Sequence, residues 1–345
     1  AEQLYRQAMA GTAEAVRRAP ENPERIFQHA QNVFYVGETA RFAGRPTEAE
    51  RSFREYKRLA DQMTALAPDN LKYRMEVLYA NENLGISLFD QNRFDEARRQ
   101  FEGSANPIEK LASLYPSNVA YQKEFVNALG WVADSQRALG NLDAAIAIRQ
   151  RQILLVNQLL ASSQDSDLRL SLIYTHRCLG IRFAEQGQYD RAVAELNAGA
   201  GEAEELVPIE PRNAEWKSEA ASTRLVLATV LLKAGQSDAA AQQTDAGCAL
   251  TAELPASFAV SARTTLRTRC ATMRSRLALG RGDTQQALKF ANEALQFVQS
   301  GHSEDPISDR YKIALAYLLI GDIRQKAGDT SAANSAWSLG LSQLP

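Results

Sequence analysis

Apolar side chains along this chain recur at helical rather than strand spacing. Within two neighbouring segments they fall at steps of three, four or seven, at Leu84 and Leu88 and then at Phe94, Ala97, Phe101, Ile108 and Leu111. Such spacing follows one face of an α-helix, whereas a half-buried strand would alternate with a period of two. No credible strand alternation is present, so the pattern predicts an all-α protein.

This pair of apolar helical segments, with a short turn between them, repeats along the whole chain. A small residue stands every 46 to 48 positions, at Ala49, Ala97, Ala145, Ala192, Ala240, Ala287 and Ala333. Five positions before each alanine stands a glycine or an asparagine, at Gly44, Asn92, Gly140, Gly187, Gly235, Gly282 and Gly328. These two residue types adopt the left-handed conformation cheaply, so each is expected to end the first helix of a pair. The alanine then allows the second helix to approach the first closely.

Breaks between the pairs carry proline and polar residues that stop one helix and cap the next, except that the break at residues 163–167 lacks the proline and keeps only the caps. The expected pairs span residues 22–68, 70–116, 118–163, 165–211, 213–255, 257–302 and 306–345, and residues 1–19 form the second helix of a truncated pair. Each pair leaves an apolar flank uncovered, so neighbours must stack. The prediction is about fifteen helices in one domain, a right-handed α-solenoid. Pro107 predicts a kink or break, because an interior proline costs a helix about 3 kcal/mol.

The motif resembles that of the tetratricopeptide repeat family. That family combines a Leu-Gly-like pair, a turn glycine, an aromatic residue and a close-packing alanine, and this chain has Leu84-Gly85, Asn92, Phe94 and Ala97. The motif returns at Leu179-Gly180, Gly187, Tyr189 and Ala192, and again at Ile320-Gly321, Gly328, Ala333 and Trp337. The period of 46 to 48 exceeds the family's ~34, which predicts longer helices. The repeats of this chain are similar to the long repeats appended to bacterial Ser/Thr kinases and other signalling proteins.

Charge and cysteine content narrow the range of partners. With 39 basic and 41 acidic residues the net charge is −2, so no global field indicates nucleic acid or a membrane surface. No run of ~18 or more apolar residues predicts a membrane span. Cys178, Cys248 and Cys270 are odd in number and far apart within apolar stretches. We expect them to be buried as small hydrophobic residues rather than joined as disulfides.

Catalytic and metal-binding motifs are missing from the sequence. There is no phosphate-binding loop, no H-E-x-x-H, no C-x-x-C and no G-x-S-x-G. His29, His176 and His302 belong to different repeats, so a shared metal site is not expected. The sequence therefore predicts a protein that is not an enzyme and has no cofactor.

Binding residues follow from the resemblance, in which first helices line a concave face. Carried onto this chain, that face includes Tyr79, Glu82, Phe89, Arg137, Tyr174 and Arg177. Aromatic rings beside charges suit a peptide groove, because rings anchor a peptide and charges orient it. A mixed surface with incidental aromatic residues is the alternative.

The first helix of the sixth pair is strongly basic. No acidic residue stands between Glu253 and Asp283, and one row carries Arg263, Arg267, Arg274 and Arg281. The apolar seam at Leu266, Cys270, Met273 and Leu277 is shifted by one position, which predicts an extra residue in the turn and places the row on the inner side of the repeat. Its partners are either acidic side chains of adjacent repeats, such as Glu215, Glu219 and Asp238, or an acidic peptide or phosphorylated protein.

Two functions remain open. The first is an interaction or sensory scaffold within a larger bacterial signalling protein, binding a protein or peptide that can be acidic. The second is a carrier or accessory domain that binds a small acidic ligand in the groove. We expect a cytoplasmic location, or a periplasmic one if an upstream part contains a transmembrane helix. Apolar ends at Leu4, Tyr5, Leu341 and Leu344 predict end-to-end self-association.

Overall fold

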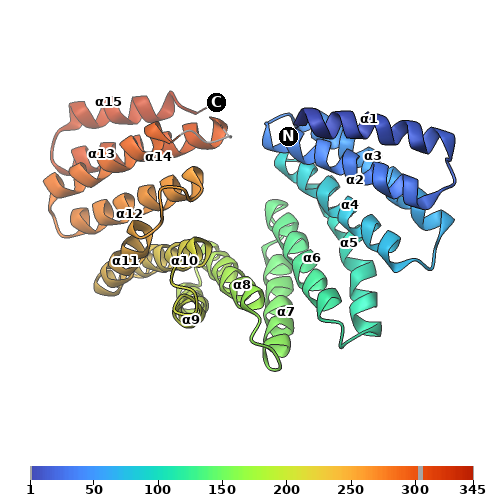
Figure 1. The fold of residues 1–345 in the computed structure, drawn as a ribbon. Helices are drawn as coiled ribbons and strands as arrows, with labels where there is room; N and C mark the ends of the chain where they lie inside the picture. The colour runs from blue at the N-terminus through green and yellow to red at the C-terminus, as the bar shows by residue number, and fades with distance from the viewer. Residues whose placement is uncertain (1, 302–305, 345) are drawn as a thin grey trace. The chain divides into compact units, whose positions relative to one another are not determined.

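The computed structural model describes residues 2–301 and 306–344, and over these residues the chain forms fifteen α-helices and no strand (Figure 1). The predicted all-α repeat architecture is confirmed. The chain divides into two compact units, Ala1–Leu155 and Val156–Pro345, each described by itself below. That residues 1–345 form a single domain stays a prediction. None of the described helices is long and apolar enough to cross a membrane.

The first unit contains an unpaired helix, two helix pairs and most of a third pair. Its helices are α1 (Glu2–Arg18), α2 (Pro23–Phe42), α3 (Pro46–Leu66), α4 (Leu71–Asp90), α5 (Phe94–Leu114), α6 (Val119–Ala138) and α7 (Leu142–Leu160), the last of which continues past the boundary. First helices of 20 residues and second helices of up to 21 account for the long period.

The second unit contains four further pairs. Its helices are α8 (Ser166–Glu185), α9 (Tyr189–Leu206), α10 (Ala214–Lys233), α11 (Ser237–Ala252), α12 (Val260–Gly280), α13 (Thr284–Ser300), α14 (Pro306–Lys326) and α15 (Thr330–Leu341). The expected break at Asp305-Pro306 begins outside the described residues, and His302 also lies outside them.

Local sequence signals set the ends of these helices as predicted. The caps that begin first helices accept hydrogen bonds from backbone N–H groups with their side chains, at Asn22, Asn70, Asn118, Asp165 and Asn213. All seven turn residues have positive φ, from 60° at Asn92 to 84° at Gly282. Only glycine and asparagine tolerate this conformation at low cost, so the turn register is confirmed.

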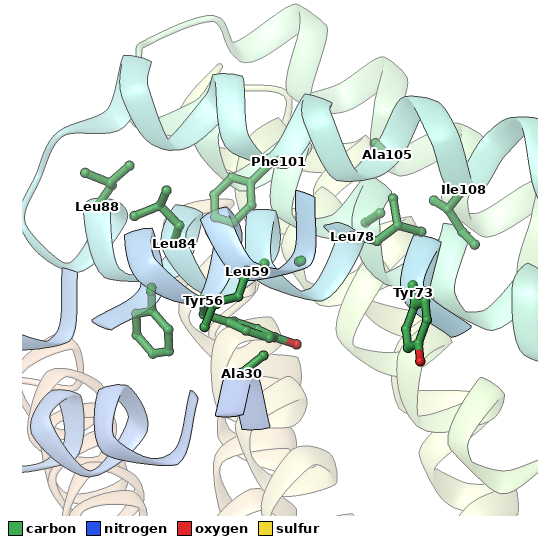
Figure 2. Close-up of a cluster of buried hydrophobic side chains, with 14 of the residues drawn as sticks. Ala30, Tyr56, Leu59, Tyr73, Leu78, Leu84, Leu88, Phe101, Ala105 and Ile108 are labelled. Carbon is green, nitrogen blue, oxygen red and sulfur yellow. The ribbon is translucent and has the colours of Figure 1, made fainter. Parts of the chain in front are cut away.

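The core lies between the two helices of each pair and continues between successive pairs. The seven spaced alanines are all at most 1% exposed. Leu84 and Leu88 of α4 lie beside Phe101 of α5 in the first unit's core (Figure 2). A Cβ added to Gly85 would lie only 2.5 Å from Cε1 of Phe101, so the close approach of α4 and α5 requires glycine there. The predicted tight pairing is confirmed.

Helix α5 runs unbroken through Pro107, so the predicted break is wrong. Proline has no N–H to donate to the carbonyl four residues earlier, which belongs to Gly103. The side chain of Asn81, buried on α4, donates from Nδ2 to that carbonyl oxygen at 3.1 Å. The neighbouring helix therefore satisfies the acceptor that proline leaves free, and the helix continues.

The cysteines and the turn of the sixth pair also differ from expectation. Cys248 of α11 and Cys270 of α12 form a disulfide with a Cα–Cα distance of 5.6 Å, whereas Cys178 is free. The predicted burial is right for the first two, but the predicted absence of a disulfide is wrong, because successive packed helices bring them together. The shifted seam of α12 is buried as predicted, yet its turn has no extra residue. Gly282 bonds to Leu279, just as Gly44 bonds to Arg41.

Candidate peptide-binding surface

The first helices of the first unit are joined by polar side chains, of which Glu76 is buried whereas Tyr79, Glu82, Glu124 and Trp131 are partly exposed. Gln31 Nε2 of α2 donates to Glu76 Oε2 of α4 at 2.8 Å. The hydroxyl of Tyr79 on α4 donates to Glu124 Oε1 of α6 at 3.3 Å. Trp131 Nε1 of α6 donates back to Glu82 Oε1 of α4 at 2.9 Å. We call Glu76, Tyr79, Glu82, Glu124 and Trp131 the acidic surface.

Three carboxyl groups on the acidic surface are held in poorly solvated positions. Burial raises the pKa of Glu76, Glu82 and Glu124 above the ordinary glutamate value, and the hydrogen bonds from Tyr56, Trp131 and Tyr79 oppose this in part. Burial and the charge of Glu124 raise the pKa of Tyr79 to about 12. Among the residues that the structure describes, none of the three carboxyls forms an ion pair. Neutral donors orient all three carboxyls, and the charge of Lys72 acts on Glu76 alone among them.

Aromatic packing fixes the surroundings of these carboxyls. The Trp131 ring stacks on Phe101 with centroids 5.3 Å apart, so the indole that holds Glu82 is anchored in the core. Phe89 packs edge to face on Phe94 at 5.1 Å and is half-buried. Arg137 is exposed, and no contact ties it to the acidic surface. Of the predicted residues in this unit, the structure brings Tyr79 and Glu82 together with partners on α6.

The first helices of the second unit carry a different polar cluster. Arg177 of α8 pairs with Glu219 of α10 at 2.7 Å, and its guanidinium lies 5.2 Å from the ring centre of Tyr174. Arg269 of α12 donates from Nη1 to Ser222 Oγ of α10 at 3.2 Å. Desolvation by the surrounding helices, and then the like charge of Arg177, lower the pKa of Arg269, although its side chain keeps contact with solvent. Tyr174 and Arg177 are therefore adjacent, and their part in binding a partner stays a prediction.

The arginine row of α12 lies on the other side of the helix from that cluster. Arg263, Arg267 and Arg274 line a pocket together with residues of α11 and α13, which are second helices, and Arg281 is not part of its lining. The predicted inner placement of the row is wrong. At 100° per residue it is Arg269 that faces α10, nearly opposite the row. Glu219 pairs with Arg177 and not with the row.

Three members of the acidic surface were missed by the sequence prediction of site residues: Glu76, Glu124 and Trp131. Glu76 and Glu124 stand 48 positions apart, one full repeat, which is a signal that could have identified them. The burial of their carboxyls has no signature in the sequence, because it depends on which neighbours cover each turn of the helix. Among the described residues, no group of three or more histidine, cysteine, aspartate or glutamate side chains is placed to hold a metal ion.

Known proteins resemble this chain in fold. Residues 79–102 and 221–246 match the family model described as Tetratricopeptide repeat. The apo form of RapI is 11% identical, with a TM-score of 0.62 over 91% of this chain and 97% of that one. The apo quorum sensor NprR from B. thuringiensis is also 11% identical, with a TM-score of 0.62 over 99% and 84% of the two chains.

A third structure contains a bound peptide. The Rap conjugation gene regulator of the plasmid pLS20, in complex with the Phr* peptide, is 13% identical, with a TM-score of 0.54 over 92% of this chain and 74% of that one. At these identities the similarity concerns the helical repeat fold alone. No curated protein sequence matches the chain.

Proposed function

We propose that this chain, which belongs to the tetratricopeptide repeat family, is a non-catalytic interaction module that binds an extended segment of a partner protein on its acidic surface. The observation that carries the proposal is the pair of carboxyls of Glu82 and Glu124, oriented by Trp131 and Tyr79 and lacking an ion-pair partner among the described residues. A basic side chain of the partner would supply the missing cation.

The physical case rests on desolvation. A carboxylate held away from water is disfavoured until an opposite charge approaches, and the raised pKa values of Glu82 and Glu124 report this penalty. A guanidinium or ammonium group placed between them would form charge-assisted hydrogen bonds, which are stronger than those to neutral donors. The ring of Tyr79, and the face of Trp131 that is not stacked on Phe101, would add the attraction of a cation to an aromatic ring. The proposed partner segment is therefore basic at this point.

The basic charge of this proposed partner differs from the acidic partner that the sequence predicted from the arginine row. That row lies in the pocket beside α11 and α13, away from the first helices. The hypothesis of a larger bacterial signalling protein stays part of the proposal. It is supported by the long repeats and by the fold shared with a quorum sensor and with a regulator that binds a peptide.

The test is a set of short peptides that differ only in one central residue, arginine, citrulline or glutamate, titrated against the protein by fluorescence anisotropy. The arginine peptide should bind most tightly, and added salt should weaken it, because charge attraction is screened. Glu82→Gln combined with Glu124→Gln should lower its affinity at least tenfold, equivalent to about 1.4 kcal/mol.

A matched control removes two negative charges elsewhere in the same unit. Glu21 and Asp69 lie exposed in loops between helix pairs, and no ion pair involves them among the described residues. Glu21→Gln combined with Asp69→Asn should leave the affinity unchanged. Equal affinity for the arginine and citrulline peptides, or an equal loss in both double variants, would contradict the proposal.

We also propose that the chain works in an oxidising compartment. Disulfides persist in the periplasm and outside cells but are rare in the cytosol, and Cys248 is bridged to Cys270. This favours the periplasmic alternative over the cytoplasmic expectation. The test is to quench cells with acid, which traps thiols in their cellular state, and then to label the free thiols of the protein. A cytosolic protein would show all three cysteines as free thiols, which would contradict an oxidising compartment.

A further inference from the structure

Arg274 occupies a position that is apolar and buried in every other pair. Eight positions before the turn residue, the other six first helices carry Val36, Leu84, Val132, Leu179, Leu227 and Ile320, each at most 8% exposed. These side chains belong to the buried core. In α12 the same position is Arg274, and it is exposed. An arginine therefore stands where the other pairs place a core aliphatic side chain, and the packing of that side chain is lost.

Arg267 repeats this replacement two turns earlier. Fifteen positions before the turn residue, three neighbouring first helices carry the buried residues Phe125, Leu172 and Ala220. In α12 this position is Arg267, which is exposed. The seam of α12 has rotated by one residue so that Leu266, Cys270 and Met273 fill the core instead. Arg274 now points to the space that an apolar side chain occupies in all six other pairs, and Arg267 to the space that one occupies in three of them.

That space is a pocket of about 480 Å³ in the second unit, formed by α11, α12, α13 and the loop after α11 (Figure 1 shows these three helices). Helix α11 has 16 residues, fewer than the 18 of α9 or the 21 of α5, and the loop residues Leu254 and Ala256 that follow it line the pocket. The lining includes Arg263, Arg267, Arg274, Glu293 and Phe297. Three arginines and one glutamate give a net charge of +2.

Contacts inside the pocket orient its guanidinium groups. The guanidinium of Arg267 lies over the ring of Phe297 at 4.2 Å from its centre. Arg263 donates from Nη1 to the backbone oxygen of Pro255 at 3.1 Å. Within the described part of the chain, neither these two nor Arg274 forms an ion pair. The disulfide between Cys248 and Cys270 forms part of the wall and ties α11 to α12.

We propose that this pocket binds a small organic phosphate, with the phosphate between the guanidinium groups of Arg267 and Arg274 and an apolar group against Phe297 and Leu254. Guanidinium forks bind phosphate oxygens through paired hydrogen bonds. The volume falls in the ordinary range for small-ligand sites. This site is separate from the acidic surface and does not depend on the proposed function.

The test uses phenyl phosphate as the probe, with phenol and inorganic phosphate for comparison, by titration calorimetry of the full chain without reductant. Phenyl phosphate should bind saturably and more tightly than inorganic phosphate, and phenol should not bind. Arg274→Leu restores the residue type of the other pairs, so it should keep the protein folded, raise its Tm and lower the affinity for phenyl phosphate at least tenfold. Arg267→Gln should lower the affinity in the same direction.

The matched control is Arg276→Gln, since Arg276 is an exposed arginine on the opposite side of the same helix. It should leave the affinity unchanged. Three results would overturn the proposal: no saturable binding of phenyl phosphate, unchanged affinity in Arg274→Leu, or an equal loss in Arg276→Gln. Binding of a phosphoserine peptide without binding of phenyl phosphate would also overturn it and would assign the pocket to a phosphorylated protein.

Discussion

The indole Nε1 of Trp131 donates a 2.9 Å hydrogen bond to the carboxyl group of Glu82, which stands one repeat earlier in the chain. This bond joins α6 to α4 across the acidic surface. The indole itself is held by stacking on Phe101 in the core. The position of the carboxyl is therefore set by the core of the repeat and not by the flexibility of a surface side chain.

The first prediction concerns pH. Because the folded pKa values of Glu76, Glu82 and Glu124 are raised, the folded protein binds more protons than the unfolded chain at pH values just above the ordinary glutamate value of 4.5. The contribution of these groups to stability is greatest below that value and is lost as pH rises through the raised pKa values. Glu82→Gln should have a Tm above that of the native protein at pH 8, with a difference that shrinks toward pH 4.5.

Thermal melts of the two proteins across this pH range give the measurement. The variant keeps an amide oxygen that accepts from Trp131, so the hydrogen bond itself is preserved. Glu21→Gln, at an exposed position, serves as the control and should show no such difference. A Tm difference for Glu82→Gln that is constant with pH would contradict the prediction.

The second prediction concerns Asn81. Asn81→Ala removes the donor to the Gly103 carbonyl, whose usual donor is missing because residue 107 is proline. This hydrogen bond is partly buried, and a fully buried carbonyl without a donor costs about 1 to 3 kcal/mol, so the free energy of unfolding should fall by up to that amount in urea denaturation. In a Pro107→Ala background the restored N–H can donate to Gly103, and the cost of Asn81→Ala should be smaller. Equal costs in both backgrounds would show that Asn81 acts in another way.

The third prediction concerns the tight contact within each pair. Ala192 is fully buried, whereas Ala194 on the same helix is exposed. Ala192→Trp should overpack the interface between α8 and α9 and lower the free energy of unfolding by about 1 to 3 kcal/mol or more. Ala194→Trp should change it little. Chemical denaturation of the two variants tests the repeat register. An unchanged free energy of unfolding for Ala192→Trp would refute it.

The fourth prediction concerns the bridge between α11 and α12. The two bridged cysteines are separated by 22 positions, and a cross-link over such a loop stabilises a protein by about 3 kcal/mol. Reduction, or Cys248→Ala combined with Cys270→Ala, should lower the free energy of unfolding by roughly this amount. Cys178→Ala should have little effect. Unfolded, unreduced protein should contain one reactive thiol, because three cysteines less the bridged two leave one. Three reactive thiols would mean that the bridge is absent.

Most of the fold could be predicted from the sequence because its signals are local and repeated. Turn residues such as Asn92 and caps such as Asn70 act within a few positions of themselves, so spacing alone places them. The continuity of α5 at Pro107 could not be predicted, because it depends on a side chain of another helix. The bridge of Cys248 to Cys270 was missed for the same reason: the odd number of cysteines argued against it, and only packing joins the two.

The candidate sites were predicted less completely. Tyr79 and Glu82 were identified from their place on a first helix, and this place is set by helical period. The side of α12 that carries Arg274 was predicted wrongly, since the shift of its seam was attributed to the turn. The turn is ordinary, and the helix has rotated instead, so the row faces α11 and α13. The end-to-end self-association expected from Leu4 and Leu341, which are 69% and 62% exposed, stays a prediction.

The most direct test of the proposed function uses the fluorescence of Trp131, whose indole lies on the acidic surface. A short peptide with one arginine, and the same peptide with citrulline, are titrated at neutral pH into the native protein and into Trp131→Phe. We expect a saturable change in emission with the arginine peptide in the native protein, little change with citrulline, and little change in the variant. An equal change with both peptides, or a saturable change that persists in Trp131→Phe, would contradict binding of a basic segment at Glu82 and Glu124.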